Sequence, residues 1–496
     1  MSAYATLERR FARISALQDA AGILDWDSQT MMPDGAAPGR AEQLATLHVL
    51  AHEQITAPDT SDLLDLADAE PLGDWQQANL REMRRHWVHA AAVPGDLVEA
   101  SSKAVSACER IWRQARPASD FAALRPSLEE VLRLKREVAA AKAAALGCSP
   151  YDALLDEYEP GGESARIDAL FDDLATFLPD LLGRVLEHQA RRPPVVLPAG
   201  PFAVSTQREL GLRFMQAVGF DFQRGRLDIS LHPFCGGAAG DVRITTRYND
   251  EDFTQSLMGV LHETGHALYE QNRPADWMLQ PVGQARGMSL HESQSLIVEM
   301  QASRTRAFLT FAAPILRAAF GGQGAAWTVD NLVRLYTRVE PGFIRVDADE
   351  VTYPAHVILR TRLEKAMVAG DLRVADLPGA WNDGMQALLG IVPPDDRRGC
   401  LQDIHWPSGG WGYFPTYTLG AMTAAQLFDA AKRGDGDVEP AIARGDFSPL
   451  MGWLKANIHS QASRYASDEL LTRATGRPLD VAIYKAHLER RYLTEA

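Results

Sequence analysis

Cysteine is scarce in this 496-residue chain, and its four cysteines, Cys108, Cys148, Cys235 and Cys400, form no Cys-x-x-Cys pair. Their wide spacing argues against disulfide bonds and against a structural zinc–thiolate site. Long apolar runs are also missing, because no window approaches the roughly 18 apolar residues of a membrane span. The N-terminal segment Met1–Arg10 has no apolar core of a signal peptide. We therefore predict a cytoplasmic chain without a membrane partner.

Basic charge is also in short supply. Lysine and arginine total 50 against 65 aspartates and glutamates, which gives a formal net charge of −15. This balance disfavours nucleic acid as a partner, because binding to phosphates requires a basic surface. Hydrophobic residues at 46% and charged residues at 23% are typical of a soluble globular protein with a large core. The length fits about three domains, or one large body with two lobes.

Strand patterns are rare, and helical periodicity dominates. Before residue 205, apolar residues recur at helical spacing over 3–20, 38–57, 75–91, 95–115, 120–146 and 164–190. Residues 25–33 are expected to form a loop, either a packed turn or the wall of a groove. Alternation of apolar and polar residues occurs at 227–231 and 241–248. The sequence therefore predicts a mainly α, multi-helix body with one small antiparallel β-sheet.

One motif has the order His-Glu-x-x-His, the segment His262-Glu263-Thr264-Gly265-His266. We predict a helix over 251–271, because N-cap residues precede it and leucines recur at helical spacing. On a helix the two histidines share one face, with Cβ atoms roughly 6 Å apart, so both can bind one zinc ion. Glu263 then lies beside a ligand and can act on water at the metal. Gly259 and Gly265 weaken the helix by ~1 kcal/mol each, but they allow close approach of another backbone.

The third ligand stays open on spacing alone. Catalytic zinc usually has three protein ligands, and the candidates are Glu270, Glu292 and Glu299. Glu270 is collinear with the histidine pair and poorly placed to complete a tetrahedron. Glu292 and Glu299 share a face of the next predicted helix, 289–318. Ser289 and Glu292 also fit a capping box, in which Glu292 would only bind the amide at the helix start.

Further motifs make the chain resemble a known family. They are His232-Pro233-Phe234, Asp241-Val242-Arg243-Ile244-Thr245, His291-Glu292-Ser293-Gln294, Ile344-Arg345-Val346-Asp347-Ala348-Asp349 and Gly399-Cys400-Leu401-Gln402-Asp403-Ile404-His405-Trp406. With the His-Glu-x-x-His motif, in this order, they resemble the carboxypeptidase Taq family of zinc metallocarboxypeptidases over most of the chain. The resemblance implies a single two-lobed peptidase domain with a deep groove, in which 1–205 form a helical wall and 206–496 hold the zinc site. It also implies a cytoplasmic homodimer that removes C-terminal residues from peptides with broad specificity.

The resemblance selects Glu292 as the third metal ligand, beside His262 and His266. Cobalt or manganese can substitute for zinc in such a site. Glu263 is then the general base that takes a proton from the attacking water. The alternatives are an endo-acting oligopeptidase with the same zinc site and a non-catalytic zinc- or peptide-binding scaffold. An intact Glu263 disfavours the scaffold, because a structural zinc site needs no base.

A carboxypeptidase must also bind the terminal carboxylate of its substrate. Arginine does this best, because its planar guanidinium pairs with both oxygens. We assign this role to Arg345, for which the alternative is a buried ion pair with Asp347 or Asp349. Arg243 is the second candidate, although its place beside Asp241 on a strand favours a structural role.

The remaining candidates are polar side chains within the motifs or near them. Tyr417 is our first choice as oxyanion donor and Tyr413 the second, and for each the alternative is an aromatic core residue. His232 and His405 are expected to line the site, as donors or as supports of the ligands. Weaker candidates for orienting the ligand imidazoles are Asp241, Gln294 and Asp403.

Overall fold

The computed structural model describes residues 2–434 and 436–495 of the chain. The chain forms two compact units, each assembled from three separate segments. Unit 1 comprises residues 1–90, 195–336 and 423–479, and unit 2 comprises residues 91–194, 337–422 and 480–496. The single two-lobed domain, with its division at residue 205, stays a prediction. Among the described residues, no helix combines the length and apolar character needed to cross a membrane.

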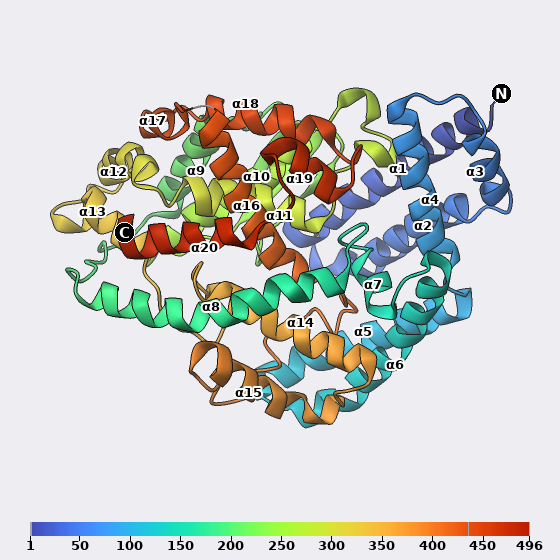
Figure 1. Ribbon diagram of the computed structural model, residues 1–496, viewed down its shortest axis with the longest axis horizontal. Coiled ribbons are helices and arrows are strands. Elements are labelled where there is room, and N and C mark those ends of the chain that lie inside the picture. Colours follow the sequence, from blue (N-terminus) through green and yellow to red (C-terminus); the bar gives the residue numbers. More distant parts are fainter. Residues whose placement is uncertain (1, 435, 496) are drawn as a thin grey trace. The chain divides into compact units, whose positions relative to one another are not determined.

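Unit 1 is mainly helical (Figure 1). Its helices are α1 (Ala3–Thr30), α2 (Ala37–Ile55), α3 (Thr60–Asp68), α4 (Asp74–Ala91), α9 (Val204–Val218), α10 (Phe253–Gln271), α11 (Met288–Leu296), α12 (Arg306–Ala319), α13 (Val329–Tyr336), α17 (Val438–Ala443), α18 (Ser448–Asn457) and α19 (Ser467–Thr475). A π-helical turn, Ile297–Ala302, follows α11. Helix α16 (Pro415–Gly434) contributes its first residues to unit 2 and the rest to unit 1.

A small sheet in unit 1 carries the metal-site helix. Its strands are β1 (Gly225–Ile229), β2 (Cys235–Ala238) and β3 (Asp241–Thr246), in the order β1-β3-β2. The pair β2–β3 is antiparallel, as predicted, but β1 runs parallel to β3. The all-antiparallel sheet was wrong in this pair, because the connection that looked flexible forms β2 and makes the chain reverse twice.

Apolar side chains of the sheet form one buried cluster with α9 and α10. Val242 and Ile244 of β3 pack there with Val260 and Ala267 of α10. Asp252 is the N-cap of α10, and its carboxylate accepts a hydrogen bond from the Thr254 amide at 2.7 Å. The sheet and the cap therefore fix the helix that carries the His-Glu-x-x-His motif.

Helix α1 continues through the segment that was expected to be a loop. Trp26 is buried, and the guanidinium carbon of Arg243 lies 4.5 Å from its ring centroid. A Cβ atom at Gly22 would lie 2.5 Å from the carbonyl oxygen of Gly237, so α1 packs directly on β2. Packing against the sheet extends the helix to Thr30, and the predicted loop was wrong up to that residue.

Unit 2 is helical as well (Figure 1). Its helices are α5 (Gly95–Ala118), α6 (Phe121–Leu146), α7 (Pro150–Leu155), α8 (Ser164–Ala190), α14 (Tyr353–Ala369), α15 (Leu377–Leu389), the start of α16, and α20 (Val481–Glu489). Helix α14 is central, because it packs against α6, α7, α8 and α15. The predicted fold class, mainly α with one small sheet, is confirmed.

Candidate metal centre

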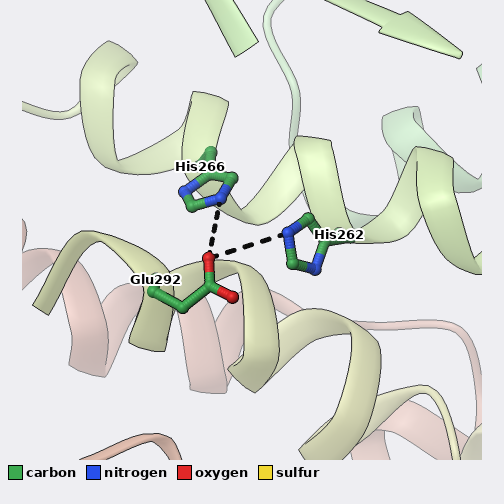
Figure 2. A group of neighbouring side chains, drawn as sticks. All are labelled: His262, His266 and Glu292. Carbon is green, nitrogen blue, oxygen red and sulfur yellow. Dashed lines mark ion pairs between the residues drawn. The ribbon is translucent and has the colours of Figure 1, made fainter. Parts of the chain in front are cut away.

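Two helices of unit 1 bring together three side chains that could hold a metal ion (Figure 2). His262 and His266 lie one turn apart on α10, as the spacing predicted, and Glu292 faces them from α11. Glu292 Oε2 lies 3.3 Å from His266 Nε2 and 3.8 Å from His262 Nε2. The ligand atoms all lie within 4.8 Å of one another, and no other described residues form such a group.

These distances suit a tetrahedral metal ion. Zinc–ligand bonds of ~2.0–2.1 Å place neighbouring ligands of a tetrahedron roughly 3.3–3.5 Å apart. The two separations from Glu292, 3.3 and 3.8 Å, are close to this value, and the two histidine nitrogens lie within 4.8 Å of each other. Two imidazoles and one carboxylate are a ligand set typical of catalytic zinc, which keeps a fourth position for water or substrate. The same set can also bind cobalt or manganese.

Gly265 determines how closely α10 and α11 approach. A Cβ atom at this position would lie 2.3 Å from the carbonyl oxygen of Gln294 and 2.6 Å from Ser295 Cα. At Gly259 the nearest atom is Thr246 Oγ1, at 4.0 Å. The close backbone approach expected from both glycines is therefore confirmed for Gly265 only.

Glu292 does not act as a helix cap. Helix α11 begins at Met288, after Gly287, whose φ of 55° lies in the left-handed region. Ser289 is thus inside the helix and cannot be its N-cap, so the capping-box alternative was wrong. The Glu292 carboxylate points at the two histidines instead (Figure 2).

His262 is held through its second ring nitrogen. Its Nδ1 lies 3.0 Å from Glu299 Oε2, and Arg304 donates to the other oxygen of this carboxylate at 2.6 Å. Glu299 reaches the imidazole from the π-helical turn Ile297–Ala302, which interrupts the helix predicted over 289–318. Such turns are frequent at functional sites. Glu299, a candidate third ligand on spacing, therefore supports a ligand.

His266 is held by another histidine. His291 Nδ1 lies 2.6 Å from His266 Nδ1, and His291 Nε2 lies 2.9 Å from Glu270 Oε1. Arg273 pairs with the same glutamate at 3.0 Å. No role was predicted for His291, although it stands directly before Glu292 in one of the motifs.

The side chains suggested as supports of the ligands have other partners. Asp241 Oδ2 lies 2.6 Å from Arg243 Nη2. Gln294 Oε1 lies 3.0 Å from His459 Nε2. Asp403 forms its ion pairs within unit 2.

Burial and nearby carboxylates set the charges of the two ligand imidazoles differently. Burial disfavours protonation of His262, but Glu292 and Glu299 outweigh it and raise the pKa of His262 to about 10. At His266 burial prevails and lowers the pKa to about 4. Burial also opposes ionisation of Glu292 and Glu299, yet the positive charges of His262 and Arg304 respectively keep each carboxyl pKa below its ordinary value. A divalent cation that binds between these groups must therefore displace the proton of His262, because a histidine binds metals as the neutral imidazole.

Glu263 is buried beside the ligands, with 7% of its surface exposed. Burial raises its pKa to about 7, and the charge of Glu292 adds to this effect while that of His262 opposes it. The side chain is not a member of the ligand group. A carboxyl group with a pKa near neutrality can both take and return a proton, which is the property required of a general base.

Unit 2 contains a second group of predicted residues, around Arg345. Its guanidinium donates through Nε and Nη2 to Asp403 Oδ1, both at 3.0 Å, and through Nη1 to the Tyr353 hydroxyl at 3.0 Å. Arg360 donates to the other oxygen of Asp403 at 2.6 Å. Arg345, Arg360 and Asp403 are all largely buried. Two guanidinium groups and one carboxylate together carry a net positive charge inside unit 2.

The buried ion pair considered for Arg345 therefore exists, but with a different acid. Asp347 and Asp349 were the candidates, and Asp403, which lies in a later motif, is the partner. Burial opposes ionisation of Asp403, yet Arg360 and Arg345 lower the pKa of this carboxyl well below its usual range.

Aromatic side chains surround the guanidinium. The Tyr417 ring centroid lies 4.8 Å from the guanidinium carbon of Arg345. The Tyr417 hydroxyl lies 3.1 Å from His405 Nε2, and the Tyr413 and Tyr417 ring centroids are 5.2 Å apart. Burial lowers the pKa of His405 to about 4, which keeps this imidazole neutral near pH 7. The structure thus brings four predicted residues together in unit 2.

The other two predicted substrate-binding residues lie near the sheet of unit 1. His232 is exposed between β1 and β2, where its carbonyl oxygen accepts from Ser230 Oγ at 2.5 Å. Arg243 on β3 pairs with Asp241 and lies over the ring of Trp26. These contacts support the structural role that the sequence favoured for Arg243.

Comparison with known proteins gives full-length matches. The family model of the carboxypeptidase Taq (M32) metallopeptidases matches residues 6–492. The chain is 39% identical to thermostable carboxypeptidase 1 of Thermus thermophilus, over 97% of each chain. It is 33% identical to carboxypeptidase 1 of Bacillus subtilis, over 98% of each. Among solved structures, Trypanosoma cruzi metallocarboxypeptidase 1 has a TM-score of 0.97 at 43% identity, with 99% of each chain covered. An M32 carboxypeptidase from Deinococcus radiodurans has a TM-score of 0.93 at 34% identity, covering 99% of this chain and 98% of that one.

Proposed function

Since this chain belongs to the carboxypeptidase Taq (M32) family of metallopeptidases, it is an exopeptidase, and we propose that it uses zinc to remove C-terminal amino acids with broad specificity. His262, His266 and Glu292 hold the ion in this proposal. Its main support is the group of three ligand atoms within 4.8 Å of one another, next to the buried Glu263.

Glu263 performs the proton transfers. A divalent ion at this position supplies Lewis acidity, which acidifies water and polarises a peptide carbonyl. Glu263 takes the proton of the attacking water and returns it to the amine that leaves. Its pKa of about 7 suits both transfers, because neither protonation state is strongly preferred near neutral pH. Tyr417 is our first candidate for the oxyanion donor, oriented by its 3.1 Å contact with His405, and Tyr413 is the second.

Arg345 binds the terminal carboxylate of the substrate in this proposal. Asp403 orients its guanidinium and neutralises only part of the local charge, because Arg360 shares the same carboxylate. A net positive charge therefore stays available for an anionic group. The guanidinium has five N–H donors, and its contacts with Asp403 and Tyr353 use three of them.

Arg345→Ala should reduce activity on peptides with a free C-terminus by ~10²-fold or more. The substrate carboxylate would lose its buried charged partner, and such a loss costs several kcal/mol. Activity on the same peptides with an amidated C-terminus should change far less. The measurement is kcat/KM for each matched pair of peptides. Arg338→Ala, which removes an exposed arginine paired with Glu340, is the control. Equal losses on both substrate forms would contradict the carboxylate role of Arg345.

Two competing functions would use only part of this set of residues. An endo-acting oligopeptidase would share the metal ligands and Glu263 but would not need Arg345. A non-catalytic zinc or peptide-binding scaffold would not need Glu263. The family resemblance further supports a cytoplasmic location, a homodimer and peptides as substrates. The proposal includes all three.

Timed release of amino acids from a peptide of mixed sequence separates these functions. We expect residues to appear one by one in order from the C-terminus. A chelator should stop the release, and added zinc should restore it, with metal content measured on the same samples. Internal fragments would instead show endo-cleavage, and bound zinc without any release would show a scaffold.

A further inference from the structure

Beyond its ligands, the candidate metal centre contains a chain of hydrogen bonds through one further histidine. His291 Nδ1 lies 2.6 Å from His266 Nδ1, and His291 Nε2 lies 2.9 Å from Glu270 Oε1. Arg273 Nε lies 3.0 Å from Glu270 Oε2. The His266 and His291 rings are 4.6 Å apart between centroids and tilted by 31°. The contacts are local to unit 1, and the side chains belong to α10, α11 and the residues that follow α10.

Glu270 determines which atom donates and which accepts in each of these hydrogen bonds. An ionised carboxylate can only accept a hydrogen bond, so His291 Nε2 must carry the hydrogen. In a neutral imidazole the other nitrogen, His291 Nδ1, is then an acceptor. It can accept only if His266 donates from Nδ1. This tautomer leaves the lone pair of His266 on Nε2, the nitrogen that faces Glu292 Oε2 at 3.3 Å.

The other ligand histidine is supported on a similar plan, but without the extra imidazole. His262 Nδ1 contacts the carboxylate of Glu299 directly, and Arg304 binds that carboxylate from its far side. Each ligand histidine is thus connected, directly or through His291, to a glutamate that pairs with an arginine. The difference is that His291 spans the distance between His266 and Glu270.

We propose that His291 is a positioning residue that fixes the tautomer and ring orientation of His266, so that His266 Nε2 is ready to bind the metal. This rests on the proposed metal site. Neutral histidine ligands bind metals through the nitrogen that carries no hydrogen, and the hydrogen bond made by the other nitrogen selects it. His291 carries the orienting effect of Glu270 to a ligand that the carboxylate does not itself contact.

A purely structural role for His291 has a clear physical meaning, because the ring also packs against Tyr269, with 5.7 Å between centroids. If His291 only fills space, a leucine should replace it better than an asparagine, which is smaller and polar. If its Nδ1 must accept from His266, asparagine should be better, since its Oδ1 stands near the place of Nδ1. The two variants therefore rank in opposite order under the two roles.

The test is zinc affinity of the full-length protein, measured by competition with a chromophoric chelator after metal removal. We expect His291→Leu to bind zinc ~10–100-fold more weakly than the unchanged chain, as is usual when a support of a ligand is lost. His291→Asn should lie within a few-fold of the unchanged chain. Glu270→Gln should also lose little affinity, because its amide oxygen still accepts from His291 Nε2. The absorption spectrum of the cobalt-loaded protein gives a second readout of the ligand geometry, which should change for His291→Leu and not for His291→Asn.

The outcomes separate this inference from the metal site itself. If the unchanged chain binds no zinc, the proposed metal site fails. If it binds zinc and His291→Leu binds equally well, or better than His291→Asn, only the role of His291 is overturned. Thermal unfolding of the metal-free variants checks that each is folded. Should His291→Leu not fold, His291→Ala compared with His291→Asn tests the same acceptor, and equal zinc affinities would overturn the role.

Discussion

The Glu263→Gln variant should lose most of its peptidase activity and still bind zinc. Glu263 lies between the two histidine ligands in sequence but is not part of the ligand group, so its removal leaves all three ligand atoms in place. Glutamine keeps the shape of the side chain and cannot take a proton from water. Because positioned general acid–base catalysis contributes ~10²–10⁴-fold, we expect kcat to fall by about this factor.

This loss can be distinguished from a folding defect. Burial raises the pKa of Glu263 to about 7, so ionisation is less favourable there than in water, and a neutral glutamine should be tolerated. The thermal unfolding temperature should therefore not fall. His266→Ala is the comparator, since it removes a ligand and should lose both zinc and turnover. The measurements are kcat on a peptide with a free C-terminus and bound zinc per chain. A Glu263→Gln enzyme with near-normal turnover would contradict the general-base role.

The sequence predicted the parts of the site that depend on local geometry. The spacing of His262 and His266 places both imidazoles on one helix face, and the structure confirms this. Spacing did not choose between Glu292 and Glu299, because both lie seven residues apart on the following segment. The choice depends on the π-helical turn Ile297–Ala302, which brings Glu299 to His262 Nδ1 while Glu292 faces Nε2. No periodic pattern in the sequence indicates that turn.

Contacts between residues distant in sequence were the other feature that could not be predicted. The alternative considered for Arg345 was an ion pair with an acid in its own motif, but its partner Asp403 stands 58 residues later. Helix α1 was expected to end near residue 20, yet packing of Trp26 against the sheet extends it. In both cases contacts between residues distant in sequence decided the outcome. The helical fold class was predictable because periodicity is a local property of each segment.

Gly265→Ala should open the metal centre, although it adds one methyl group and raises helix propensity. The new Cβ atom would lie 2.3 Å from a carbonyl oxygen and 2.6 Å from a Cα atom of α11, against an ordinary contact of at least 3.4 Å. These atoms are backbone, so no side chain can rotate to relieve the overlap. The helices must separate by roughly 1 Å, which exceeds the ~0.5 Å tolerance of a preorganised site. A displacement of this size costs ~10²-fold in rate when it misplaces catalytic groups.

Gly259→Ala is a matched control on the same helix. Its Cβ atom would meet only Thr246 Oγ1 at 4.0 Å, so the gain in helix propensity is unopposed. We expect Gly259→Ala to raise the free energy of unfolding by up to ~1 kcal/mol and to leave zinc affinity unchanged. Overpacking should make Gly265→Ala less stable by ~1–3 kcal/mol, with zinc binding and turnover weakened together. The measurements are thermal unfolding and chelator competition on both variants. If the two alanines behave alike, backbone contact at Gly265 does not control the distance between Glu292 and the histidines.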